Sequence, residues 1–239
     1  MNLNINKKIL LTMKKELHGI VLGATGATGR ELVELLLSSD KWTSITIVIR
    51  RKIDRWNNLA DKQKNKLKII QKDNLDFINN NIKELKNIFI ENNYSTVFCC
   101  IGASNLKISK EEYYKIHYTY VSYCADLCEK LDILQFSFIS GKGANSNSWF
   151  FYPKTKGQSE ENIMNKNIKQ VSIFQPGLLI NRDNNYRFIE SVIYYIPFMS
   201  KISSLDLAKC ILNEATDYHI KNKKAEHKIY SHEEILDLS

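Results

Sequence analysis

The chain has 239 residues, 44% of them hydrophobic, which is enough for one large core and too short for several ordinary domains. Its net charge of +8 raises the question of nucleic-acid binding, but the basic residues are dispersed among 24 asparagines, and only six of the 34 are arginine. This dispersed pattern indicates a solvated, lysine-rich surface and excludes a nucleic-acid partner from our expectations.

The first 16 residues carry four lysines and a short apolar patch, Ile9-Leu10-Leu11. They are too short and too weakly apolar for a secretory signal, and they lack the arginine and serine of a mitochondrial presequence. We expect residues 1–16 to be a flexible extension and residues 17–239 to be the folded domain.

Apolar runs stay short of the ~20 residues that a membrane-spanning helix needs, so we expect no integral membrane segment. A cytoplasmic location is expected, with mitochondrial or nuclear association left open.

Strand and helix patterns alternate from residue 17 onward. Strands are predicted at 18–22, 44–49, 67–70, 96–101, 135–139 and 170–174. Helices are predicted at 28–38, 82–92, from a Ser109 cap to about 130, and 204–218, with a polar stretch at 53–66 and an apolar, aromatic one at 187–195. This alternation favours an α/β fold in which helices cover both faces of a mostly parallel, doubly wound sheet in a single domain.

Five cysteines, at positions 99, 100, 124, 128 and 210, form no C-x-x-C pair. Cys124 and Cys128 share a helix face, but no histidine cluster accompanies them, so a zinc site is not expected. Buried thiols in a reducing compartment are the simpler interpretation.

A glycine-rich turn, Gly23-Ala24-Thr25-Gly26-Ala27-Thr28-Gly29, lies between the first predicted strand and helix. Gly23 permits a tight turn, Gly26 permits close approach to a pyrophosphate, and Gly29 permits tight packing of helix on sheet. The helix N-terminus adds free N–H groups and a partial positive charge. The turn as a whole, including Thr25, Ala27 and Thr28, therefore predicts a dinucleotide site.

Three further positions follow strands two, three and four. Arg50-Arg51-Lys52 stands where an NAD-specific site usually has an acid, and a basic pair instead suits the 2′-phosphate of NADP. Asp73 occupies a position suited to an adenine contact, and Gly102 allows the backbone to approach the dinucleotide. The alternatives are a solvated strand end, a plain loop aspartate and a glycine that only ends a strand.

Tyr152 and Lys156 are spaced to share a helix face, and Pro153 fits the first helical turn. A lysine ammonium close to a phenol favours its ionised form, so that the phenol can act as general acid or base toward a carbonyl or alcohol. Alone, this spacing is common in a chain with 12 tyrosines. It gains weight because it follows the fifth strand and Ser140, where ligands and catalytic groups collect.

Several blocks occur together in the order found in one superfamily. They are the Gly23–Gly29 turn, Arg50-Arg51-Lys52, Phe98-Cys99-Cys100-Ile101-Gly102, Lys142-Gly143-Ala144, Tyr152-x-x-x-Lys156-Gly157 and Phe174-Gln175-Pro176-Gly177-Leu178-Leu179. Over residues 17–218 the chain resembles the short-chain dehydrogenase/reductase superfamily. More narrowly, it resembles the atypical group that includes the Tat-interacting protein family.

The resemblance implies a Rossmann-type fold that binds NADPH and reduces a small carbonyl substrate, with Tyr152 as acid/base and Lys156 bound to the nicotinamide ribose. It also implies that Pro176, Gly177 and Leu178 lie along the nicotinamide and that Arg182 reaches the cofactor phosphates. An NADPH-binding regulatory protein with a protein partner is the alternative.

Three positions depart from the family pattern. The family's double serine is Ser140-Gly141 here, so Ser140 is either the substrate-orienting hydroxyl or only its neighbour. His117 replaces an acid in the long helix, and Gln175 replaces the arginine before Pro-Gly.

Overall fold

The computed structural model describes residues 15–51, 53–80, 82–89, 93–103, 108–180, 200–221 and 223–239. Its main element is a seven-stranded sheet in which every neighbouring pair is parallel, in the order β3-β2-β1-β4-β5-β6-β9. The strands are β1 (Leu17–Leu22), β2 (Trp42–Ile49), β3 (Leu67–Gln71), β4 (Thr96–Cys99), β5 (Gln135–Ile139), β6 (Gln170–Phe174) and β9 (His227–Tyr230). This topology confirms the doubly wound Rossmann-type α/β fold.

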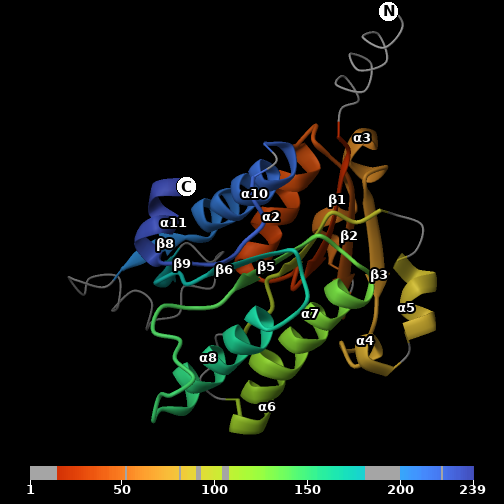
Figure 1. Ribbon diagram of the computed structural model, residues 1–239. Helices are drawn as coiled ribbons and strands as arrows, with labels where there is room; N and C mark the ends of the chain where they lie inside the picture. Colours follow the sequence, from red (N-terminus) through yellow and green to blue (C-terminus); the bar gives the residue numbers. More distant parts are fainter. Residues whose placement is uncertain are drawn as a thin grey trace, which may run out of the picture.

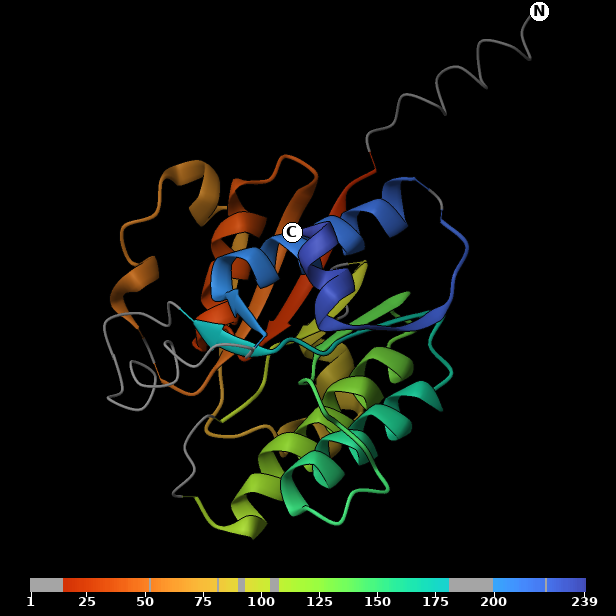
Figure 2. The same ribbon diagram turned by 90° about the vertical axis from the view of Figure 1, so that its left-hand side faces the viewer.

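Helices cover both faces of the sheet (Figures 1 and 2). On one face lie α2 (Ala27–Ser38), α10 (Ser204–Ile220) and α11 (His232–Leu238); toward the other lie α4 (Phe77–Asn80), α5 (Ile82–Phe89), α6 (Lys110–Tyr114), α7 (Tyr120–Lys130) and α8 (Phe151–Met164). Two hydrophobic clusters result, one under α2 and α10 and one under α5, α7 and α8. Because both faces are covered, the central strands carry almost unbroken apolar runs.

The remaining elements are short. Between β2 and β3 the chain forms η1 (Asp54–Trp56) and α3 (Asp61–Lys64), where we expected only a polar stretch. A π-helical turn, η2 (Lys115–Thr119), joins α6 to α7 without a break, so the predicted long helix is continuous but not regular. Its Ser109 cap is confirmed, since the Ser109 hydroxyl accepts a hydrogen bond from the Glu112 amide at 3.1 Å.

The predicted strand at 96–101 was two residues too long. β4 ends at Cys99, and the Cys100 amide instead donates to the Leu22 carbonyl at 2.8 Å, where the chain turns behind the glycine-rich segment. The predicted helix at 82–92 ends at Phe89 in the described part, and residues 90–92 and the stretch at 187–195 lie outside the described residues.

The C-terminal third contains elements that the sequence pattern did not predict. A two-stranded parallel sheet pairs β7 (Leu178–Ile180) with β8 (Lys201–Ser203), while β9 extends the main sheet and α11 follows it. These strands are short and only partly buried, so they lack the apolar run that identifies a central strand.

At the amino ends of β5 and β6, a buried polar network fixes α10 against the sheet. Glu214 of α10 accepts hydrogen bonds from the Gln135 and Gln170 amides at 2.8 and 3.3 Å. Burial raises the pKa of Glu214 to about 7, and the hydrogen bonds from Ser172 and the two glutamines oppose that rise only in part. In the same network, Thr96 contacts the Gln135 side chain and the His219 ring.

Among the described residues, no helix combines the length and the apolarity required to cross a bilayer. The five cysteines are free thiols, and four of them are buried, as expected. Of the predicted extension, residues 1–14 lie outside the described part; the Lys15 ammonium donates to the His219 carbonyl at 2.9 Å.

Candidate cofactor and active site

The strand order reverses direction between β1 and β4, and this is where doubly wound sheets bind their ligands, beyond the carboxyl ends of the strands. The glycine-rich turn leaves β1 at this point. Gly23 has φ +83°, and a Cβ on it would lie 2.5 Å from the Cys100 carbonyl oxygen, so no larger residue fits. The Gly26 amide closes the turn by donating to the Gly23 carbonyl at 3.0 Å.

The N-terminus of α2 has no side-chain cap and no acidic residue in its first turn. In contrast, α6, α10 and α11 are each capped by a serine, Ser109, Ser203 or Ser231. The first amides of a helix have no intrahelical partner, and together with the helix dipole they attract an anion. Thr25 and Gly26 are exposed, so the turn fits a pyrophosphate group.

The other predicted cofactor residues in the first half lie at the same edge of the sheet. Arg50 and Arg51 are exposed directly after β2, Asp73 is exposed two residues after β3, and Gly102 is exposed three residues after β4. The structure thus brings these positions to one edge, on either side of the glycine-rich turn. Arg182 lies outside the described residues.

Tyr152 lies in the first turn of α8 and is 38% exposed. Its ring packs edge-on against Tyr113 of α6, with 4.6 Å between ring centroids, and contacts Phe151 at 5.7 Å. These contacts hold the ring while leaving part of it accessible. Burial raises the pKa of Tyr113 to about 12, with a further contribution from Tyr152, so Tyr113 stays a neutral neighbour.

Lys156 lies one helical turn after Tyr152 and extends over the end of β5. A Cβ on Gly141 would lie 3.6 Å from the Lys156 Cδ and Cε atoms, which is an ordinary van der Waals distance. The lysine side chain therefore passes directly beside position 141. Burial lowers the pKa of Lys156 to about 8, although the nearby Glu160 and Cys99 oppose the shift. The ammonium is therefore still mostly charged at neutral pH.

Ser140 comes directly after β5, and its hydroxyl is buried. It interacts with the Glu160 carboxylate, although it makes no hydrogen bond of good geometry. Glu160 also accepts from the Gln175 amide at 3.0 and 2.9 Å, and its burial raises its pKa while Ser140, Gln175 and Lys156 oppose that rise. Gln175 thus forms a part-buried contact with Glu160 of α8.

His117 lies in the π-helical turn and is buried. It stacks on Tyr113 at 4.1 Å, and its Nε2 lies 3.2 Å from both the amide and the carbonyl of Ala103, the tautomer deciding which bond forms. Burial lowers its pKa to about 4, and the Lys156 charge adds to this effect. π-helical turns often mark functional sites, and this one places a neutral imidazole between Gly102 and Tyr113.

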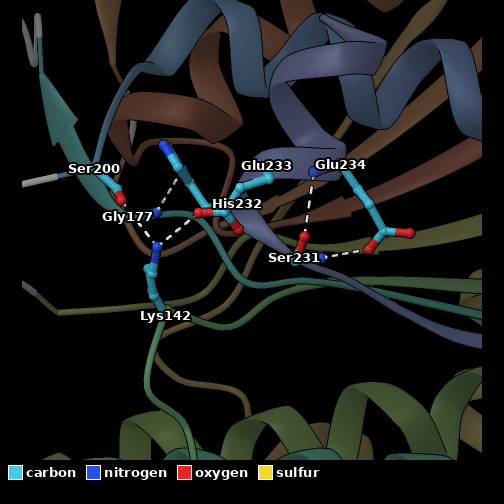
Figure 3. A network of polar contacts seen from close by, with 7 residues as sticks. All are labelled: Lys142, Gly177, Ser200, Ser231, His232, Glu233 and Glu234. Atoms are coloured by element: carbon cyan, nitrogen blue, oxygen red, sulfur yellow. Dashed lines mark hydrogen bonds and ion pairs between the residues drawn. The ribbon is translucent and has the colours of Figure 1, made fainter.

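The segment Pro176-Gly177-Leu178, which is expected to lie along the nicotinamide as the opposite wall of the site, follows β6, and residues from the C-terminal elements hold it. The Gly177 amide donates to His232 Nδ1 at 3.0 Å (Figure 3). The Leu178 amide donates to the Ser200 carbonyl at 2.8 Å. The sequence pattern did not identify His232. Its contact spans 55 residues, and no local signal points to it.

Comparisons with known proteins agree with this geometry. Residues 23–217 match the NAD(P)H-binding family. The chain is 26% identical over 164 residues to HTATIP2 of Rattus norvegicus, covering 67% of this chain and 62% of that protein. It is 30% identical over 176 residues to the mitochondrial protein FMP52-2 of Scheffersomyces stipitis, covering 72% of this chain and 71% of that one.

Among solved structures, MoeE5 in complex with UDP-glucose and NAD superimposes with a TM-score of 0.64. The match covers 90% of this chain and 75% of that one at 15% identity, so it supports the fold alone. The family match extends from the glycine-rich turn to α10. The chain therefore belongs to the NAD(P)H-binding family of atypical short-chain dehydrogenases/reductases, together with HTATIP2 and FMP52.

Proposed function

We propose that the protein is an NADPH-dependent oxidoreductase that reduces a small carbonyl compound, or oxidises the corresponding alcohol. One observation carries this proposal. Tyr152 and Lys156 stand one turn apart on α8, and Lys156 reaches the end of β5, at the same sheet edge as the dinucleotide turn after β1.

The residues have distinct roles in this proposal. NADPH supplies the hydride when it is bound. Tyr152 gives its proton to the carbonyl oxygen of the substrate and recovers it from solvent. The Lys156 ammonium, charged at neutral pH, stabilises the phenolate left behind and binds the nicotinamide ribose. Ser140, beside Glu160, supports the substrate side of the site.

The choice of NADPH over NADH rests on Arg50 and Arg51. Both are exposed at the end of β2, where the ribose of the adenosine half is held in this fold. Two guanidinium groups match a 2′-phosphate with charge-assisted hydrogen bonds, whereas a 2′-hydroxyl would leave both unpaired. In the proposed site, Asp73 contacts the adenine, and Gly102 lets the backbone after β4 approach the dinucleotide.

The test is turnover of a panel of aldehydes, ketones and alcohols by wild type and by Tyr152→Phe. Loss of the phenolic proton should lower turnover by about 100-fold or more and leave NADPH affinity within about twofold. Tyr114→Phe is the matched control, because Tyr114 is an equally exposed tyrosine on α6 that stacks on Tyr118. Equal turnover by wild type and Tyr152→Phe would contradict the proposed mechanism.

A second candidate is an NADPH-binding regulatory protein with little turnover. Gly141 supports it, because it stands where the resemblance implies a serine of the family pattern. This candidate predicts a protein partner whose affinity changes with NADPH, by linkage. A pull-down that recovers the same proteins with and without NADPH would contradict it.

The FMP52 relatives are named mitochondrial, which gives a mitochondrial location as the alternative to the cytoplasmic one expected from the sequence. Fractionation of cells that express the tagged protein, with or without residues 1–16, separates the two locations.

A further inference from the structure

Three backbone groups of the segment Pro176-Gly177-Leu178 are held by three different parts of the chain. The Lys142 amide donates to the Pro176 carbonyl at 2.8 Å, the Ser200 carbonyl accepts from the Leu178 amide at 2.8 Å, and His232 Nδ1 accepts from the Gly177 amide at 3.0 Å. Of these three partners, only His232 uses a side chain. It is therefore the contact that a substitution can remove.

Gly177 has no room to move toward β8. A Cβ at this position would overlap the Ser200 backbone, so the segment packs directly on the start of the small sheet. His232 Nδ1 accepts the hydrogen bond of this part-buried N–H group, so the amide keeps a partner where it faces α11.

The position of His232 is itself fixed from two sides (Figure 3). Ser231 and Glu234 form a capping box at the start of α11, with hydrogen bonds of 3.2 and 2.9 Å. The Lys142 ammonium links the loop after β5 to the helix, since it contacts the Ser200 hydroxyl at 2.9 Å and the Glu233 carboxylate at 2.8 Å. His232 is buried between them, with only 3% of it exposed.

We propose that His232 is a positioning residue for the nicotinamide end of the cofactor site. By accepting the Gly177 hydrogen bond, it fixes the wall along which the nicotinamide lies and links α11, at the end of the chain, to the reacting end of the dinucleotide. This inference rests on the proposed function, because it takes the Pro176–Leu178 segment to be the nicotinamide wall.

The contact requires a neutral ring. Nδ1 accepts a hydrogen bond only when it carries no proton, which places the ring hydrogen on Nε2. Among the described residues, the charges that act on the ring are Glu233 on its own helix and Lys142 on the facing loop. Burial lowers the pKa of His232, Glu233 opposes that shift and Lys142 adds to it, so the ring is neutral at physiological pH.

Two variants separate the hydrogen bond from packing. His232→Asn keeps an acceptor close to the position of Nδ1 and does not titrate, whereas His232→Leu removes the acceptor. Each is titrated with NADPH and with 2′-phospho-ADP-ribose, which lacks the nicotinamide. We expect His232→Leu to bind NADPH about 5-fold more weakly and 2′-phospho-ADP-ribose as wild type does, and His232→Asn to restore NADPH binding. Unchanged NADPH binding by His232→Leu, or equal weakening for both ligands, would overturn the proposal.

A second measurement needs no cofactor. In the free wild-type protein, the Gly177 amide resonance should shift as pH is lowered and His232 is protonated, and this shift should be absent in His232→Asn. A Gly177 resonance that does not change with pH in wild type would show that the Gly177 amide is not bound to His232 Nδ1, and would overturn the inference. If the resonance shifts but wild type binds neither ligand, the proposed function itself fails, and with it the role of His232 toward a nicotinamide.

Discussion

The two walls of the candidate site are built by different means. The wall around the glycine-rich turn is made of backbone: Gly23 is in a left-handed conformation against Cys100, and α2 starts without a side-chain cap. The wall around Gly177 is held by side chains and strands from elsewhere in the chain, above all His232 and the capped helix α11. The first wall leaves its amides for an anion, whereas the second wall satisfies its own amides and offers a fixed surface.

This difference decides what each wall tolerates. A backbone-made wall has almost no room for a Cβ, so it responds to substitution by steric strain. The wall around Gly177 is also closed to a Cβ, but it depends in addition on the His232 hydrogen bond and on the α11 cap, and therefore responds to their loss and to pH. Four variants, taken from the largest expected effect to the smallest, test this distinction.

The first variant is Gly23→Ala, with Gly143→Ala as its control. Both glycines have positive φ, +83° and +86°, but only the first has a neighbour within 4 Å of an added Cβ. Conformation alone should cost Gly143→Ala about 1 kcal/mol, whereas overlap with Cys100 should bring Gly23→Ala to about 3 kcal/mol or more. Urea unfolding measures both free energies, and equal losses would show that the turn is not sterically closed.

The second variant, Glu214→Gln, tests the titration of the side-chain network under α10. The pKa of Glu214 is raised to about 7, so the folded state holds this proton more tightly than the unfolded state does. The contribution of this proton to the free energy of unfolding is complete below about pH 4.5 and is lost as pH rises through 7. We expect Glu214→Gln to match wild type near pH 4.5 and to exceed its stability by roughly 3 kcal/mol at pH 8.

His219 titrates in the opposite sense, because burial and the Lys15 charge lower its pKa to about 4, and its contribution is lost as pH falls below about 6.5. Wild type and Glu214→Gln both retain His219, so the difference between their free energies of unfolding at each pH isolates Glu214. A difference that stays constant from pH 4.5 to 8 would contradict the raised pKa of Glu214.

The third variant replaces both Arg50 and Arg51 by serine. Loss of two guanidinium groups should weaken NADPH binding by at least about 10-fold and leave NADH binding unchanged, because only the 2′-phosphate is affected. Arg55→Ser is the control, since Arg55 pairs with Glu31 and Glu34 on α2. Fluorescence titration with each nucleotide gives the ratio of its dissociation constants in the variant and in wild type. An equal loss of affinity for NADH and NADPH would contradict the preference for NADPH.

The fourth variant is Ser231→Ala, which removes the helix cap that orients His232. Loss of the cap should lower the free energy of unfolding by about 1 kcal/mol, because the Glu234 amide loses its acceptor. Urea unfolding measures this loss, with Ser148→Ala as a control whose hydroxyl accepts from the exposed Phe150 amide. An unchanged midpoint would show that β9 and the Lys142 contacts alone place α11.

The same contrast explains what the sequence could predict. The fold, its six central strands and the glycine-rich turn depend on local patterns: apolar runs, helical spacing and glycines at fixed offsets. Tyr152 and Lys156 are one helical turn apart and were also visible locally. His232 contacts Gly177 across 55 residues, and Lys142 contacts Glu233 across 91, so no window of sequence contains both partners.

Two other features were missed for related reasons. The edge strand β9 contains His227 and Lys228 and is only half-buried, so it resembles a loop in composition. The π-helical turn at His117 packs against α8, where the Ser159 hydroxyl donates to the His117 carbonyl at 2.5 Å. Helical spacing alone predicts a regular helix through this point.

The parallel pairing of β7 with β8 has a consequence for how this family can diversify. Leu178 pairs with Lys201 and Ile180 with Ser203, so the chain leaves the small sheet at Ile180 and returns to it in register at Lys201. The intervening connection therefore joins the carboxyl end of β7 to the amino end of β8, at opposite ends of the small sheet. Because the entropy of closing a loop grows only slowly with its length, this connection can be lengthened, shortened or exchanged at little cost in stability. Under the proposed function, cofactor recognition depends on the main sheet, and this connection is the part of the chain whose length can change without disturbing it.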